Sequence, residues 1–197
     1  GIKEYAIRFA KEQDLTAQLG SSQTASSNLA DKIKARLSVG HSFDWRVLFS
    51  MADEAYGGTQ ADGKYTPKDA YDAMEAGMNR YILSRPDLFS PAKGREDAML
   101  AVAALTRVTN LMPTQTKRTA EQDEFQQFST VPPFAYVANW VANIQAGETM
   151  AEFSAGTGGL AVFAKNAGAK LVLNELSARR AAVLREVFPG AQVFQEN

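Results

Sequence analysis

The segment 152–161, EFSAGTGGLA, combines one carboxylate, two hydroxyl groups and three glycines between two apolar runs. Gly156 and Gly158 can adopt positive φ and have no Cβ, so a ligand can lie directly against the backbone there. Ser154 and Thr157 add hydroxyl donors. Where such a loop opens a helix, unpaired N–H groups and the positive end of the helix dipole point outward. We therefore interpret 152–161 as a loop that binds a small molecule.

Two acidic residues narrow the choice of ligand. Glu175 ends the apolar run LVLNE, nineteen residues after Gly156, where a carboxylate can accept both hydroxyls of a ribose. The loop satisfies the G-x-G-x-x-G/A pattern, so NAD is one possible ligand. Glu152 favours a different ligand, because its carboxylate would repel a pyrophosphate and attract an ammonium or sulfonium group. S-adenosylmethionine carries both cationic centres and a ribose, and it suits the loop better.

Strands and helices are expected to alternate around this loop. The apolar segments TMAEFS, KLVLNE and AQVFQE are separated by the helical stretches GLAVFAKNAG and SARRAAVLREVFPG, the second of which is expected to show a solvated face. Strands joined by single helices imply right-handed crossovers into a parallel sheet, and ligands bind beyond the carboxyl ends of such strands. The expected fold class is α/β, with the first half of a Rossmann-like sheet, about three parallel strands, in residues 127–197.

The preceding part of the chain is expected to be all-helical. Leu29, Ile33 and Leu37 recur every four residues, the spacing of a buried helix face. Thr66 and Pro67 provide an N-cap and a first helical residue. The helix that follows has an apolar face, which we assign to the core. This face consists of Tyr71, Met74, Met78, Tyr81 and Ile82. The predicted organisation is a flexible segment at 1–27 with a Ser-rich stretch, a helical domain at 28–112, a polar linker at 113–126 and the α/β domain at 127–197.

Composition excludes several classes of function. The 197 residues are 45% hydrophobic and 22% charged, as in a soluble globular protein, and 21 basic residues nearly cancel 22 acidic ones. The absence of cysteine and the single histidine, His41, which we assign to the surface or to a helix cap, argue against a metal site. No apolar run reaches the ~18–20 residues that span a bilayer, and no leader pattern opens the chain. We expect a cytoplasmic protein without membrane contact, cut from a longer one.

Two motifs resemble those of a known family. EFSAGTGGLA is similar to motif I of the class I S-adenosylmethionine-dependent methyltransferases, especially the E-P-S-A-G-T-G form of adenine-N6 DNA methyltransferases. QFSTVPP, at 127–133, resembles the F-x-T-P element that those enzymes place before motif I. Three further stretches are ADEAYGG…GKYTPKDAYDAMEAGMNRY, LMPTQTKRT…EFQQFST and NWVANI. Through them the chain, over about residues 40–197, also resembles the methyltransferase region of large phage and conjugative-element proteins that join a methyltransferase to a strawberry-notch-like helicase.

The resemblance implies S-adenosylmethionine as cofactor and a role for each matched residue. Phe153 in place of proline and the inserted Val131 depart from the family pattern. The implied contacts are Glu152, Ser154, Ala155, Gly156, Thr157 and Gly158 around the methionine part, Glu175 at the ribose, Asn174 and Leu176 beside the adenine, Phe128, Ser129 and Thr130 closing the pocket, and Glu196 or Asn197 at the adenine amine.

One family element is missing from the chain. Adenine-N6 methyltransferases grip the target amine with an N-P-P-F or D-P-P-Y segment, whose aromatic ring stacks on the flipped base, and the 197 residues contain neither. The resemblance therefore implies the cofactor-binding part of an enzyme that methylates an exocyclic amine of DNA, adenine N6, with no catalytic residue of its own and no activity alone.

The implied partners are DNA and the methyltransferase and helicase regions downstream. The implied role is modification of phage or mobile-element DNA, as in restriction–modification. An alternative from another class is a non-catalytic helical module, in which residues 28–110 dock onto DNA or protein.

Overall fold

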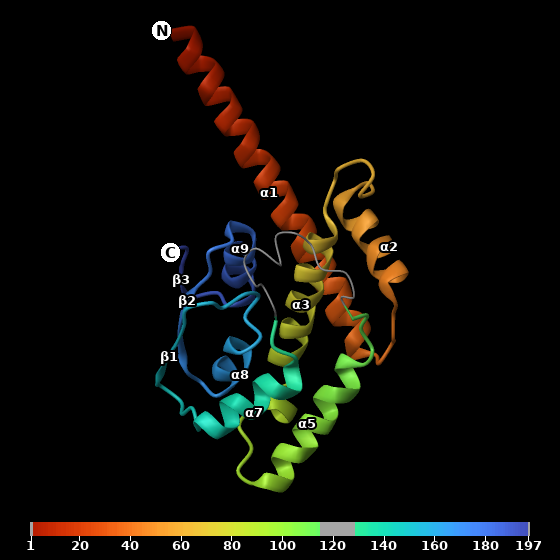
Figure 1. The fold of residues 1–197 in the computed structure, drawn as a ribbon, viewed down its shortest axis with the longest axis vertical. Coiled ribbons are helices and arrows are strands. Elements are labelled where there is room, and N and C mark those ends of the chain that lie inside the picture. The colour runs from red at the N-terminus through yellow and green to blue at the C-terminus, as the bar shows by residue number, and fades with distance from the viewer. Residues whose placement is uncertain (1, 115–128, 197) are drawn as a thin grey trace.

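The computed structural model describes residues 2–114 and 129–196, with side chains from residue 20 onward. The described part contains a helical region followed by alternating strands and helices (Figure 1). The elements are α1 (Ile2–Ser38), α2 (Trp45–Tyr56), α3 (Pro67–Leu83), α4 (Pro86–Phe89), α5 (Arg95–Thr109), α7 (Pro132–Ala142), β1 (Thr149–Glu152), α8 (Ala161–Asn166), β2 (Lys170–Asn174), α9 (Ala178–Val187) and β3 (Gln192–Phe194). The expected α/β class is confirmed.

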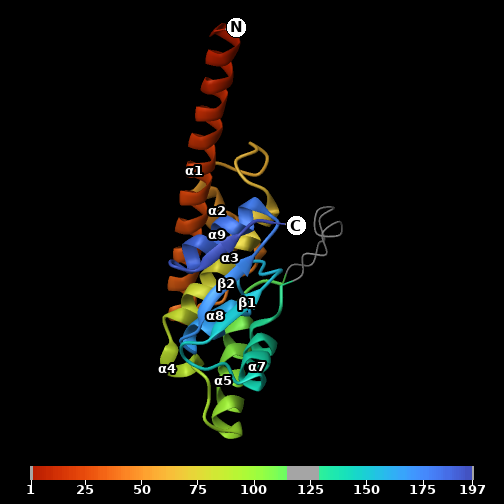
Figure 2. The same cartoon turned by 90° about the vertical axis from the view of Figure 1, so that its left-hand side faces the viewer.

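The strands form one parallel sheet in the order β1-β2-β3, so the three expected strands are confirmed. The helix α8 connects β1 to β2, and α9 connects β2 to β3. Leu171 and Leu173 of β2 are buried, whereas Phe153 and Phe194 lie exposed at the strand ends. Figure 2 shows the strands in front of α3, toward the viewer. The carboxyl ends of all three strands therefore meet at one edge, next to the loop that follows β1.

Helix α3 lies at the centre of the molecule, between α1 and α2 on one side and α8 and α9 on the other (Figure 1). A single apolar cluster includes Ile33 of α1, Ile82 of α3, Leu173 of β2 and Leu184 of α9, all fully buried. The helical and α/β parts thus share one core through α3.

The start of α3 agrees with the sequence prediction. Thr66 is the N-cap and Pro67 the first helical residue, and a capping box pairs Thr66 with Asp69. The side chains of Met74 and Met78 are buried, as predicted. These features depend on local sequence, which is why periodicity and cap residues identify them.

The segment predicted to be flexible, 1–27, is helical from Ile2 onward, because α1 runs unbroken from Ile2 to Ser38; its flexibility remains a prediction. Contacts with α3 stabilise the Ser-rich part as helix. Ala25 is buried, and Arg80 donates hydrogen bonds to the backbone oxygen and the hydroxyl of Ser27 at 2.9 and 2.8 Å. Such tertiary contacts override weak helix propensity. Residues 115–126 of the predicted linker lie outside the described residues.

The close approach of α1 and α3 generates a test. A Cβ on Gly77 would lie 2.8 Å from the backbone oxygen of Ala30 and 2.8 Å from Cβ of Ile33. We expect Gly77→Ala to lower the free energy of unfolding by about 1–3 kcal/mol through overpacking, measured by urea denaturation. The matched control is Gly20→Ala in α1, where a Cβ meets nothing within 4 Å and helix propensity favours alanine. Equal stability of the two variants would contradict the packing described here.

Candidate functional site

The loop 153–160 connects β1 to α8 at the carboxyl end of the sheet. The N–H of Ala155 donates to the backbone oxygen of Asn174 at 2.9 Å, which ties the loop to the end of β2. The φ angles of Gly156 and Gly158 are 56° and 92°, in the left-handed region expected for them. The sequence-predicted ligand loop is therefore a tight turn at the edge where ligands of parallel sheets bind.

The two glycines are required for different reasons. A Cβ on Gly158 would lie 2.3 Å from the ring of Phe188, so this position must be glycine for packing. A Cβ on Gly156 would meet only the guanidinium of Arg180, at 3.6 Å. Gly156 is therefore the position at which the backbone leaves room for a ligand.

Glu175 holds the loop through the backbone. Its side chain is buried, with Oε2 accepting the N–H of Gly156 at 2.8 Å and Oε1 accepting the N–H of Ser177 at 2.9 Å. These two bonds fix the distance between the glycine loop and the start of α9. A carboxylate has about four lone-pair sites, so each oxygen keeps one acceptor position for a further donor.

Glu152 lies at the end of β1, and its carboxyl group faces the loop–helix junction. Burial raises its pKa to about 7; the backbone N–H of Ala161, at the start of α8, opposes this rise, and the charge of Glu175 adds to it. Its Oε2 atom is buried and accepts no hydrogen bond from the described residues. A buried acceptor without a donor is costly, so a donor that reached this atom would stabilise the site.

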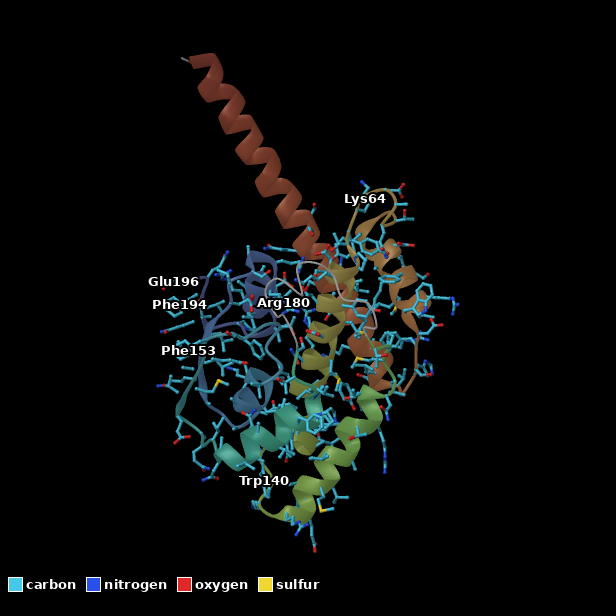
Figure 3. All side chains as sticks on the ribbon, viewed as in Figure 1. Lys64, Trp140, Phe153, Arg180, Phe194 and Glu196 are labelled. Carbon is cyan, nitrogen blue, oxygen red and sulfur yellow. The ribbon has the colours of Figure 1, made fainter. Side chains whose placement is uncertain are left out.

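Asn174 joins the ends of the three strands. Its Nδ2 donates to the backbone oxygens of Phe153 and Glu196 at 3.2 and 2.9 Å, and its Oδ1 accepts the N–H of Glu196 at 2.9 Å. Ser154 and Leu176 are exposed beside it. In Figure 3 the labelled Phe153, Phe194 and Glu196 lie on the same outer side of the sheet. These residues form the open rim of the site, while the predicted contacts Phe128 and Asn197 lie outside the described residues.

The segment before α7 lies beside the glycine loop, as expected. A Cβ on Gly159 would lie 3.4 Å from the backbone oxygen of Thr130. Ser129 reaches the loop indirectly, because its hydroxyl and that of Thr157 both donate to Oε2 of Glu75 on α3, at 2.7 and 2.6 Å. The structure therefore brings Ser129, Thr130 and Thr157 together, with a helix of the N-terminal region as their support.

The polar residues of α3 near this site were not predicted from the sequence. Asp72, Glu75 and Asn79 follow the spacing i, i+3, i+7 within the apolar stripe of α3, which places them on one face of the helix. Asn79 donates from Nδ2 to the backbone oxygen of Thr157 at 2.8 Å. Polar residues at helical spacing between buried ones were the signal available in the sequence.

The prediction that SARRAAVLRE presents a solvated face is wrong for Arg180, whereas Arg185 is exposed. Arg180 is buried and donates from Nε to Asp72 at 3.1 Å, and Arg179 donates from Nε to the same carboxylate at 2.8 Å. Figure 3 shows Arg180 between α9 and α3. The acceptor lies more than a hundred residues earlier in the chain, so local sequence could not reveal it. His41 is exposed, as expected.

Within residues 2–114 and 129–196 no group of three His, Cys, Asp or Glu side chains is arranged so that it could hold a metal ion. None of the helices that the structure describes is apolar over a length sufficient to cross a bilayer. Comparison of the chain with protein-family models, curated proteins and solved structures finds no match. The function has to be inferred from the chemistry of the site itself.

The raised pKa of Glu152 predicts a specific pH dependence of stability. A carboxyl group whose pKa rises from 4.5 to about 7 on folding binds more protons in the folded state, so its contribution favours folding below pH 4.5 and is lost as pH rises to 7. We expect Glu152→Gln to remove this slope and to raise the free energy of unfolding at pH 8 by up to about 3 kcal/mol. Urea denaturation between pH 4 and 8 measures the free energy of unfolding of both proteins. Equal slopes of this free energy against pH would contradict the prediction.

Proposed function

We propose that this chain binds S-adenosylmethionine at the junction of β1 and α8, as the cofactor-binding part of a methyltransferase that acts on an exocyclic amine of DNA, adenine N6. The observation that carries the proposal is the carboxyl group of Glu152, whose buried Oε2 has no donor among the described residues. An ammonium group supplies such a donor together with a positive charge.

The electrostatics of the strand ends support a cationic ligand. The charge of Glu175 contributes to the raised pKa of Glu152, which means that the two carboxylates repel each other. A cation placed between the loop and Glu152 relieves this repulsion. The pyrophosphate of NAD would add negative charge at the same place, so NAD fits the site less well.

The other cofactor groups have matching residues at the rim. The free acceptor positions of Glu175 suit ribose hydroxyls, the exposed side chain of Leu176 offers an apolar surface to an adenine ring, and Glu196 lies at the tip of β3. Gly156 leaves the loop open beside the methionine part. When bound, the cofactor supplies an activated methyl group, and the residues of this chain bind and orient it.

The DNA substrate is proposed from the resemblance of motif I and QFSTVPP to adenine-N6 methyltransferases. A helical interaction module is the alternative if no nucleoside cofactor binds.

Calorimetric titration with S-adenosylhomocysteine, and separately with NAD, tests the proposal. We expect S-adenosylhomocysteine to bind and NAD not to bind. Glu152→Ala should weaken binding about 10- to 100-fold, the loss expected when a charge-assisted hydrogen bond is removed. Affinity should rise between pH 6 and pH 8, because the ligand ammonium pairs with the ionised form of a group whose pKa is about 7.

The matched control is Glu148→Ala, which removes a glutamate just before the opposite end of β1, where its carboxylate accepts the N–H of Gln145. This variant should bind as the unchanged chain does. Tight binding of NAD would contradict the proposal, and so would an affinity for S-adenosylhomocysteine that Glu152→Ala leaves unchanged.

A further inference from the structure

We infer that Glu75 of α3 is a positioning residue for the cofactor site, which holds the glycine loop and the segment before α7 at a fixed separation. The inference rests on the proposed function. It assigns to the N-terminal helical region a direct part in shaping the proposed cofactor site, which the motifs of the α/β region do not reveal.

The geometry is a shared acceptor. Oε2 of Glu75 receives the hydroxyl of Thr157, in the middle of the glycine loop, and the hydroxyl of Ser129, two residues before the N-cap of α7. The two segments that should enclose the cofactor from opposite sides are therefore joined through one oxygen atom.

Thr157 is held by α3 at two points. Its side chain is buried, its hydroxyl donates to Glu75, and its backbone oxygen accepts from Asn79. The residues on either side, Gly156 and Gly158, have positive φ, and glycines have the largest freedom to leave such a conformation. Anchoring the residue between them restricts both, so the open backbone at Gly156 is ready for a ligand before the ligand arrives.

Removing Glu75 should leave α3 in place. Asp72, one turn earlier, is bonded to Arg179 and Arg180 of α9, and Met78 and Ile82 are buried in the shared core. These contacts do not involve Glu75. Loss of its carboxyl group therefore releases the loop and Ser129 without undocking the helix.

The role requires an oxygen acceptor and does not require a charge. Burial raises the pKa of Glu75, and the neighbouring Asp72 adds to this rise. A glutamine has an oxygen of the same reach and can accept the two hydroxyls. Glu75→Gln should therefore retain the ligand binding that Glu75→Ala weakens. If the role of Glu75 were purely electrostatic, both variants would bind more weakly.

The test uses the full chain and S-adenosylhomocysteine as the probe, with the dissociation constant from calorimetry and the melting temperature measured for each protein. We expect Glu75→Ala to weaken binding about 10-fold and Glu75→Gln to remain within about 2-fold of the unchanged chain, by the loss or retention of the hydrogen bonds. Thr157→Val should also weaken binding, and the double variant should be no weaker than Glu75→Ala, because Glu75→Ala already removes the contact that Thr157→Val breaks. Glu96→Ala, an exposed glutamate of α5, is the control and should not change binding.

Hydrogen exchange of the ligand-free protein gives an independent readout. Amides of the loop 153–160 should exchange faster in Glu75→Ala than in Glu75→Gln, with exchange in α1 unchanged. If Glu75→Ala does not fold, Ser129→Ala and Thr157→Val take its place, and each should weaken binding.

Binding by the unchanged chain that is indifferent to Glu75→Ala, or a glutamine variant as weak as the alanine variant, would overturn the role of Glu75 and leave the proposed function standing. Absence of binding by the unchanged chain would contradict the proposed function and, with it, any role of Glu75 at a cofactor.

Discussion

The site depends on three carboxyl groups around one glycine loop, which receive different numbers of hydrogen bonds. Burying a carboxyl group is costly unless donors compensate it. Glu175 receives two backbone N–H groups and Glu75 receives two hydroxyls. Glu152, the third acid at the loop, keeps a buried oxygen without a donor among the described residues. The first two carboxyl groups shape the loop, and under the proposed function the third receives a donor and a positive charge from the ligand.

This arrangement makes α3 a structural member of the site. Its apolar side packs on α1, while its polar face reaches α9 through Asp72 and the loop through Glu75 and Asn79. The helix α3 thus packs in the core and also anchors the glycine loop. A separation of the helical region from the α/β region would expose both sets of contacts to water. The helices and the sheet therefore stabilise each other through one shared core.

The sequence was informative wherever local pattern determines the outcome. The three strands, the capped start of α3 at Thr66 and the positive φ of Gly156 follow from apolar runs, cap residues and glycine placement. The errors share another cause. The helical conformation around Ser27, the burial of Arg180 and the anchoring of Thr157 depend on contacts between residues about 50 to more than 100 positions apart. No periodicity encodes such pairs. The domain boundary at 113–126 and the residues assigned to the cofactor remain predictions.

The most direct test of this account is the titration of the Glu152 carboxyl group, followed by carbon-detected NMR with and without S-adenosylmethionine. In the free chain its pKa should lie near 7, and addition of the cofactor should lower it, because a cation stabilises the ionised form. A pKa near 4.5, the ordinary value, or a raised pKa that the cofactor leaves unchanged, would contradict the claim that Glu152 receives the cationic part of the ligand.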